Sequence, residues 1–329
     1  MRNMITTVIL ASLAMPLQAQ DDWFTGSANV EVNVGRHKET KHYGLYDFPH
    51  ITLDASAQMG KGWSAVAELE YERFYQDGTW DNNLRSDYAT NALYINKRWA
   101  ESLNVRGGII DIPVGITNSG GPALTIYDPV SESLIAPMTW HDGGLAIWGS
   151  CRRWSYSAGL YVYGDAPLKR SRVLGTALRA SYLFPFSLSV GVSGFYGDTR
   201  RGMWHQQQVA AEGKSHDWLG SVDAWLENGG WTADGSVIMT NGGHDVSAGV
   251  EAGYDVMLAV GVSTMTVIPF VRYDGVFREG SKSLNRYLVG VNLSPLPNLV
   301  FKADFAFNHK QGSTTRQSVD ASLGYTIEF

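Results

Sequence analysis

The last twelve residues of the chain, SVDASLGYTIEF at 318–329, alternate between apolar and polar side chains without a break. The apolar members are Val319, Ala321, Leu323, Tyr325, Ile327 and Phe329. A period of two residues is typical of a β-strand with one apolar face. Because chain ends are usually polar and frayed, this stripe predicts an environment that covers apolar side chains up to the terminal Phe.

The same alternation recurs along the chain, for example in ITLDASAQM at 51–59 and in WSAVAELEY at 63–71. It predicts sixteen strands, at 24–35, 47–59, 63–75, 86–97, 103–111, 140–150, 154–164, 172–183, 186–197, 215–226, 231–241, 244–255, 264–275, 283–293, 298–309 and 315–329. Short connections such as GKG, AES and CRR alternate with longer polar ones such as 112–139. We therefore expect the short turns at one end of the sheet and most long loops at the other.

This pattern favours an all-β transmembrane antiparallel β-barrel of about 16 strands, with 14–18 compatible with the spacing. Strands of about ten residues cross a bilayer when tilted, and closure pairs every backbone group. The alternative is a secreted soluble sandwich, jelly roll or propeller. The small residues on the polar faces, only 11 Pro and the single Cys151 speak against that alternative.

The start of the chain reads as a cleaved signal peptide at 1–20, followed by the barrel at 21–329. Arg2 precedes an apolar run from Ile5 to Ala14, and Leu17-Gln18-Ala19 forms a passable cleavage site. The run of about ten apolar residues is too short to cross a bilayer as a helix. Without the signal, 25 Lys and Arg stand against 32 Asp and Glu, a net charge of about −7, which argues against a nucleic-acid partner. The expected location is the Gram-negative outer membrane.

In the segment 91–149, Pro113-Val114-Gly115 follows a predicted strand, and Pro137, Thr139, Trp140 and Gly143 lie where the next one begins. With these motifs the segment resembles Bacteroidetes-type porins related to the phosphate-selective porin O/P family. Pro113-Val114-Gly115 matches the turn that ends a strand in those proteins. Pro137, Thr139, Trp140 and Gly143 match their second motif, with Asp142 in place of Glu, whereas the usual His-Glu-Pro is missing from the stretch between. The resemblance implies a sixteen-stranded porin, usually a homotrimer, and leaves the solute open.

A barrel of sixteen strands is wide enough to hold an aqueous channel, so inward polar residues are the candidate functional surface. Strand parity predicts these pore-lining residues: Glu68, Glu70, Glu72, Arg106, Arg179, Arg272, Arg286, Lys302 and Asp304. Arg272, Arg286 and Lys302 stand on three consecutive strands and could form a basic arc. We expect 112–139 to fold inward as a constriction loop that presents Asp128 and Glu132 to that arc, giving weak cation preference or none. The alternative is that these charges simply pair.

The predicted function is a passive diffusion channel for small hydrophilic solutes and ions, with outer-membrane lipid around it. No catalytic residue, cofactor or metal is expected, because His residues lack the spacing of a three- or four-ligand site and no Gly-x-Ser-x-Gly elbow is present. Two alternatives stay open. The barrel could be an adhesin or structural protein, or an outer-membrane hydrolase whose triad is assembled from distant strands.

Overall fold

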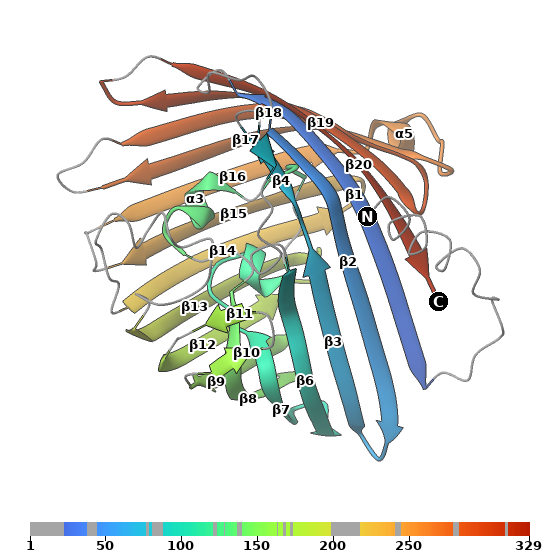
Figure 1. Cartoon of the computed structure of the whole chain (residues 1–329), viewed down its shortest axis with the longest axis vertical. Helices are drawn as coiled ribbons and strands as arrows, with labels where there is room; N and C mark the ends of the chain where they lie inside the picture. The colour runs from blue at the N-terminus through green and yellow to red at the C-terminus, as the bar shows by residue number, and fades with distance from the viewer. Residues whose placement is uncertain are drawn as a thin grey trace.

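The computed structural model describes residues 23–37, 45–76, 79–80, 88–120, 124–127, 129–136, 140–162, 164–166, 169–171, 174–198, 218–240, 245–278, 283–312 and 315–329. Sixteen long strands form one antiparallel ring (Figure 1). They are β1 (Phe24–His37), β2 (Leu45–Gly60), β3 (Trp63–Tyr71), β6 (Tyr88–Ala100), β7 (Leu103–Asp111), β8 (His141–Cys151), β9 (Trp154–Tyr161), β12 (Leu174–Leu183), β13 (Leu188–Asp198), β14 (Trp218–Asn228), β15 (Trp231–Thr240), β16 (Val246–Tyr254), β17 (Thr266–Phe277), β18 (Leu284–Leu296), β19 (Leu299–Lys310) and β20 (Arg316–Glu328).

The remaining elements are short. They are β4 (Phe74–Gln76), β5 (Thr79–Trp80), the hairpin β10 (Gly164–Ala166) and β11 (Lys169–Ser171), a 3-10 turn η1 (Thr117–Ser119), α3 (Val130–Ser133) and α5 (Val256–Ala259). The sequence predicted none of these, because each is only one turn or a few residues long. No helix in the described ranges is long and apolar enough to cross a membrane.

The ring closes because the last strand pairs with the first. β1 and β20 run antiparallel from Ser27 opposite Glu328 to His37 opposite Ser318. Every other long strand pairs with its neighbour in chain order. The predicted all-β antiparallel barrel of about 16 strands is therefore confirmed. The predicted signal peptide lies outside the described residues.

The predicted strand boundaries are correct to within a few residues. The strand predicted at 154–164 ends at Tyr161, and the one predicted at 215–226 runs from Trp218 to Asn228. The short connections after β2, β6, β8, β14 and β18 all join ends on the same side of the ring, as predicted. The stretch 256–263, which showed no turn signal, begins with α5, whose first turn is capped by Asp255: its carboxylate accepts from the Met257 N–H.

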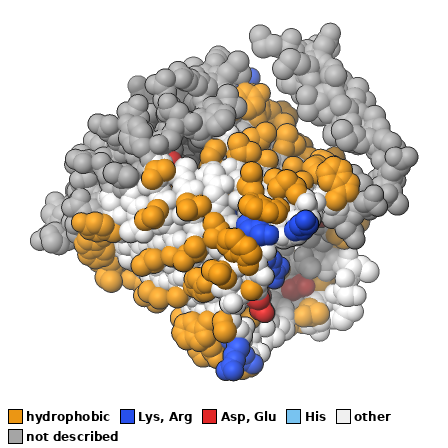
Figure 2. Space-filling view, turned by 90° about the horizontal axis from the view of Figure 1, so that it is seen from below, with side chains coloured by type: hydrophobic (Ala, Val, Ile, Leu, Met, Phe, Trp, Pro, Cys, Tyr) orange, Lys and Arg blue, Asp and Glu red, His pale blue; other side chains and the backbone are white. Residues whose placement is uncertain are grey.

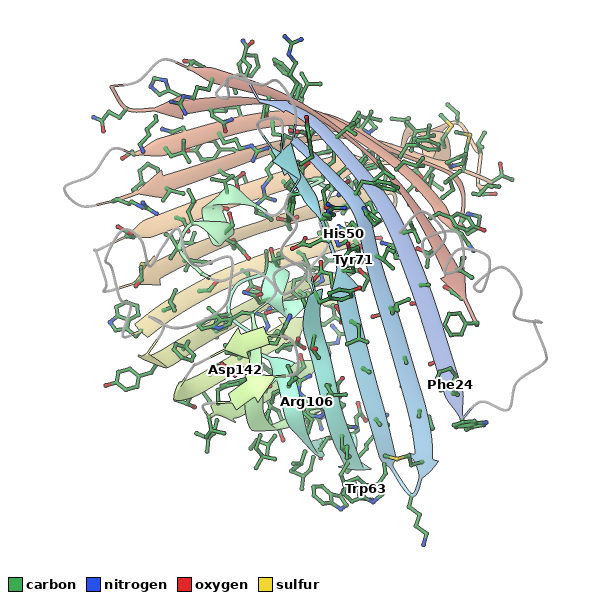
Figure 3. All side chains as sticks on the ribbon, viewed as in Figure 1. Phe24, His50, Trp63, Tyr71, Arg106 and Asp142 are labelled. Atoms are coloured by element: carbon green, nitrogen blue, oxygen red, sulfur yellow. The ribbon has the colours of Figure 1, made fainter. Side chains whose placement is uncertain are left out.

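The outer face of the ring is apolar. Leu160, Leu178 and Val271 are 63%, 59% and 58% exposed, and Figure 2 shows apolar side chains over much of one side with few charged ones. Aromatic residues gather beside the short turns, where Trp154 contacts Tyr182 and Trp231 contacts Tyr254, with ring centroids 4.9 and 5.0 Å apart. Trp63 lies at this end in Figure 3. An apolar band with an aromatic rim is the surface that a bilayer covers.

Part of the interior is also apolar, which strand parity did not predict. Trp140 packs on Phe195 with ring centroids 4.7 Å apart, in a buried cluster that includes Val114, Leu219 and Ile238. The inner wall is apolar here because the segment after β7 docks on it. The run Val237-Ile238-Met239, apolar on both faces, was the available sequence signal.

Candidate functional site

The candidate site is the inner wall of the barrel together with the segment that folds against it. On β17, Val271 is 58% exposed and the next residue, Arg272, 4%; on β20, Val319 is 53% exposed and Asp320 1%. Successive strand residues point to opposite faces. Since the outer face is apolar, the charged members of these pairs lie inside the ring.

The segment after β7 runs along the interior. Three hydrogen bonds tie it to distant strands: Gly115 N–H donates to Ser193 Oγ on β13 at 3.3 Å, Leu124 N–H to Glu251 Oε1 on β16 at 2.7 Å, and Lys302 Nζ on β19 to the Thr125 carbonyl at 3.0 Å. α3 contacts β15, β16 and β17. The described parts of 112–139 therefore lie on the inner wall from β13 to β19.

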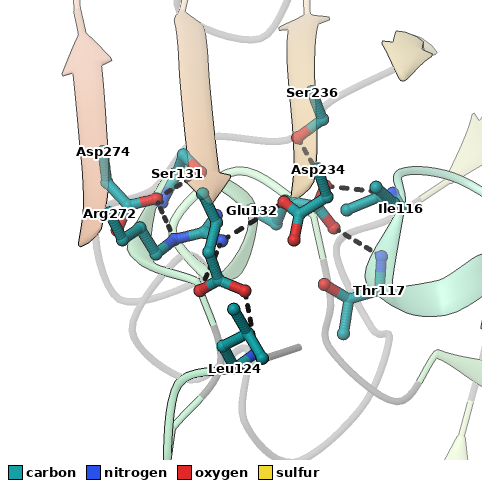
Figure 4. Close-up of polar contacts among 10 residues, drawn as sticks. Ile116, Thr117, Leu124, Ser131, Glu132, Asp234, Ser236, Arg272 and Asp274 are labelled. Carbon is teal, nitrogen blue, oxygen red and sulfur yellow. Dashed lines mark hydrogen bonds and ion pairs between the residues drawn. The ribbon is translucent and has the colours of Figure 1, made fainter. Parts of the chain in front are cut away.

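Glu132 fastens this segment to the wall (Figure 4). Its Oε1 accepts from Ser236 Oγ at 2.6 Å and from the Ile116 N–H at 3.0 Å, while Oε2 accepts from the Thr117 N–H at 3.0 Å. The residue is fully buried. Gly115, with φ +83°, approaches the carboxylate so closely that a Cβ would lie 2.8 Å from Oε2. Glu132 therefore joins both ends of the segment to β15.

Beside Glu132, one arginine is enclosed by three carboxylates (Figure 4). Arg272 Nε donates to Asp274 at 3.0 Å, and its Nη1 lies 3.4 Å from both Asp234 and Glu251. All four side chains are at most 2% exposed. Ser131 of α3 donates to Asp274 at 2.7 Å. We call Asp234, Glu251, Arg272 and Asp274 the sealed wall, because these buried charges lie against α3.

A second buried pair stabilises the wall between β12 and β14. Arg179 donates through both terminal nitrogens to Asp223, each at 2.7 Å, with side-chain exposures of 9% and 0%. The guanidinium passes over Gly191 of β13, where a Cβ would lie 2.5 Å from Nη2 and 2.7 Å from the carboxylate. Glycine is therefore needed between the two partners.

The opposite part of the ring carries mainly acids. Its inward carboxylates, which we call the acidic wall, are Glu31, Asp47, Glu68, Glu70, Asp304 and Asp320, on β19, β20, β1, β2 and β3. Asp304 lies directly opposite Asp320 in the strand register, and the two are 4% and 1% exposed. Lys302 of β19, which donates to the Thr125 carbonyl, adds a positive charge near Asp304. Carboxylates so close together attract cations.

The infolded segment reaches the acidic wall at Tyr127. Burial raises the pKa of the Tyr127 hydroxyl above its ordinary value, and the charges of Asp320, Asp47 and Asp304 raise it further. The hydroxyl is buried and has no hydrogen-bond partner. The segment thus brings an uncharged polar group into a region of strongly negative potential.

Asn91 holds two of the predicted acids in place. It falls at a bulge in β6, where Glu68 pairs with Ala92 but Leu69 pairs with Thr90. Its amide donates to Glu68 at 3.2 Å and to Glu70 at 2.7 Å. Strand alternation did not predict this role, because it does not reveal the bulge in β6.

The structure places the remaining predicted residues as follows. Arg106 lies 3.7 Å from Asp111, at the end of β7. Arg286 lies opposite Asp274 in the register of β17 and β18. Glu72 lies beside Asp47 and His50. Asp128 lies outside the described residues.

Two predictions about the constriction need correction. Glu132 is not presented to the lumen, because it is buried and its carboxylate accepts hydrogen bonds from its own segment and from Ser236 of β15. The basic arc is interrupted at Arg272, which is enclosed by acids as in the alternative that these charges pair, while Lys302 donates to the uncharged Thr125 carbonyl. Long-range pairing, which parity alone does not reveal, accounts for both.

Comparison of the sequence with known proteins identifies no family and one uncharacterized relative. No family model matches the sequence. An uncharacterized protein of Aquifex aeolicus is 26% identical over 188 residues, which cover 50% of this chain and 40% of that protein. The chain thus matches less than half the length of that relative.

Several solved outer-membrane barrels have a similar structure. OmpF of Salmonella typhi, solved with daunomycin, is 12% identical with a TM-score of 0.65, covering 92% of this chain and 97% of that one. A mutant porin of Rh. blastica is 12% identical with a TM-score of 0.57, covering 92% and 100%. The trimer form of OmpT of Vibrio cholerae is 10% identical with a TM-score of 0.61, covering 93% and 100%. At these identities the likeness shows a porin-like barrel.

Proposed function

We propose that the chain forms a water-filled outer-membrane channel through which small hydrophilic solutes and ions diffuse down their gradients. The observation that carries the proposal is a closed ring of sixteen strands with an apolar outside, a charged inside and a segment tied across its inner wall. Rings of this size hold aqueous channels. Such a channel needs no catalytic residue and no cofactor.

The proposed ion preference is for cations. The three carboxylates of the sealed wall share one arginine and are at most 2% exposed beneath α3, so we expect the ion preference to depend mainly on the acidic wall. Arg106, Arg179 and Arg272 all lie beside carboxylates, which speaks against a ladder of free basic groups for phosphate. We therefore keep the proposed relation to the Bacteroidetes-type porins, based on Pro113-Val114-Gly115 and Trp140, without carrying over phosphate selectivity.

Export and assembly are part of the same proposal. Residues 1–20 would direct the chain out of the cytoplasm and be removed, and 21–329 would insert into the outer membrane. A homotrimer is supported by an outer hollow of about 460 Å³, whose lining includes the larger Leu93, Tyr94 and Ile95 of β6 and, on β2, β3 and β7, the small residues Ala55, Ala57, Ala65, Ala67, Gly107 and Gly108. Small side chains let neighbouring surfaces approach closely.

Recording from purified protein in a planar bilayer tests the channel. Stable conductance steps that arrive in groups of three would support a trimeric pore. Folded, heat-modifiable protein without conductance would contradict the proposal. Turnover of a lipid or peptide substrate would then favour the hydrolase, and binding that depends on the outer loops would favour the adhesin.

A further inference from the structure

We propose that Asp47, His50 and Glu72 bind a divalent transition-metal ion of the Zn²⁺ class on the inner wall of the barrel, at the β2 end farther from the short turns. One nitrogen or oxygen of each side chain lies within 4.8 Å of the others. His50 lies on the inner side of β2 near Tyr71 (Figure 3). The proposal concerns binding and does not depend on conduction.

A bulge in β2 brings two of these residues to one face. Glu31 pairs with His50 and Asn33 with Asp47, so two steps along β1 match three steps along β2. In a regular strand, residues three apart point to opposite faces. The extra residue of the bulge puts both side chains inside, which explains why strand parity did not reveal the site.

The hydrogen bonds of His50 leave one ring nitrogen for a metal. Nε2 lies 2.8 Å from Glu70 Oε1, and the other oxygen of Glu70 accepts from Asn91 at 2.7 Å. Nδ1 lies 3.0 Å from Asp47 Oδ2, an ion-pair distance, but outside the geometry of a hydrogen bond, so a metal ion could replace this contact. A carboxylate that holds one imidazole nitrogen and orients the other is the usual support of a metal-binding histidine.

A buried oxygen of Asp47 without a hydrogen-bond partner independently supports a metal site. The residue is 3% exposed, and its Oδ1 has no hydrogen-bond partner, while Oδ2 accepts from Asn33 Nδ2 at 3.2 Å. A buried carboxylate oxygen without a partner is costly. A cation between Asp47 and His50 Nδ1 would satisfy that oxygen. The side chain of His50 is 21% exposed, which leaves the group accessible from the lumen.

The donor set selects the class of metal. Two carboxylates and one neutral imidazole suit Zn²⁺ and similar ions, whereas Mg²⁺ and Ca²⁺ prefer oxygen ligands alone. Three carboxylates, those of Asp47, Glu70 and Glu72, surround one histidine. A divalent cation would therefore also reduce the repulsion among them.

Calorimetric titration of untagged, folded protein in detergent with ZnCl₂ tests the proposal. We expect one Zn²⁺ per chain, retained in excess Mg²⁺. Glu70→Gln should weaken binding by about 10–100-fold, and His50→Ala and Glu72→Gln should weaken it further. His309→Ala and Glu101→Gln, which change residues outside the cluster, should leave the affinity unchanged.

Two outcomes would overturn the proposal: no binding by the unchanged protein, or equal binding by His50→Ala and Glu72→Gln. Heat-modifiable migration on gels confirms that each variant is folded, and Glu72→Gln, which keeps the side-chain shape, replaces His50→Ala if that variant does not fold. The titration does not measure conductance, so a protein that binds no Zn²⁺ would contradict the metal site without contradicting the proposed channel.

Discussion

The sealed wall and the acidic wall lie in the same ring but differ in how their charges are balanced. In the sealed wall, Arg272 is surrounded by three carboxylates, and Ser131 of α3 donates to one of them, Asp274. In the acidic wall, carboxylates such as Asp304 and Asp320 face one another across paired strands. The difference indicates that the sealed wall holds the infolded segment in place, and in the function proposed above the acidic wall would set the ion preference.

The largest loss of stability is expected when the guanidinium group of the sealed wall is removed. Arg272→Ala leaves three buried carboxylates without a cation, and removing one partner of a buried ion pair costs about 3–5 kcal/mol. We expect that loss in urea unfolding of the barrel in lipid vesicles, together with larger and noisier conductance. Arg286→Gln, a change of a half-buried arginine on the next strand, is the control and should cost much less. Equal losses of unfolding free energy in Arg272→Ala and Arg286→Gln would contradict the assignment of Arg272 as the central cation of the sealed wall.

The contact between α3 and β16 can be tested by a substitution on β16 whose side chain would clash with α3. A Cβ on Gly249 would strike Ser131 and lie 2.8 Å from Arg272 Nη2. Gly249→Val should therefore push α3 off the wall, at a cost of about 3 kcal/mol, the upper end for overpacking. Single-channel conductance should rise. Gly220→Ala is the matched control, because its Cβ would meet only Trp218 at 3.6 Å; unchanged conductance in Gly249→Val would show that α3 does not narrow the pore.

A smaller effect is expected where an ion pair lies outside the infolded segment. Gly191→Ala places a methyl group between Arg179 and Asp223 and should cost about 1–2 kcal/mol. Since this pair only braces β12 against β14, the urea midpoint should fall while the conductance stays the same. A change in conductance without loss of stability would assign the pair to the pore.

In the acidic wall, removing one charge should raise the free energy of unfolding, whereas the substitutions above should lower it. Like charges directly opposite one another destabilise a sheet, so Asp304→Asn should raise stability by about 0.2–1 kcal/mol. It should also lower the preference for cations, because one charge leaves the lumen. Ser318→Ala, which changes a neighbouring inward residue without altering charge or removing a hydrogen bond, is the control. A loss of stability in Asp304→Asn would indicate that a cation normally occupies the acid pair.

Much of the barrel could be read from local sequence, because period-two alternation needs no knowledge of distant residues. The strands at 299–310 and 316–328 are clear examples. The ties of the infolded segment could not be read in this way: Ser236 and Glu132 are 104 positions apart, and Ser131 and Asp274 are 143 apart. Which inward charges meet depends on register across several strands.

The remaining parts of the site depend on β-bulges, which strand parity could not predict. The extra residue in β2 places Asp47 and His50 on one face, and the bulge in β6 puts Asn91 between Glu68 and Glu70. Parity assigned the inward face of Glu68 and Glu70 and could not supply these partners. A run such as Val237-Ile238-Met239 could have indicated that the interior is partly apolar, since it breaks the alternation.

The most direct test of the contrast between the two walls is the reversal potential of single channels in a gradient of KCl. A pore whose free charge lies on the acidic wall should favour K⁺ over Cl⁻, and the preference should shrink in Asp304→Asn. Selectivity for Cl⁻, or a K⁺ preference that Asp304→Asn leaves unchanged, would contradict the assignment of the acidic wall.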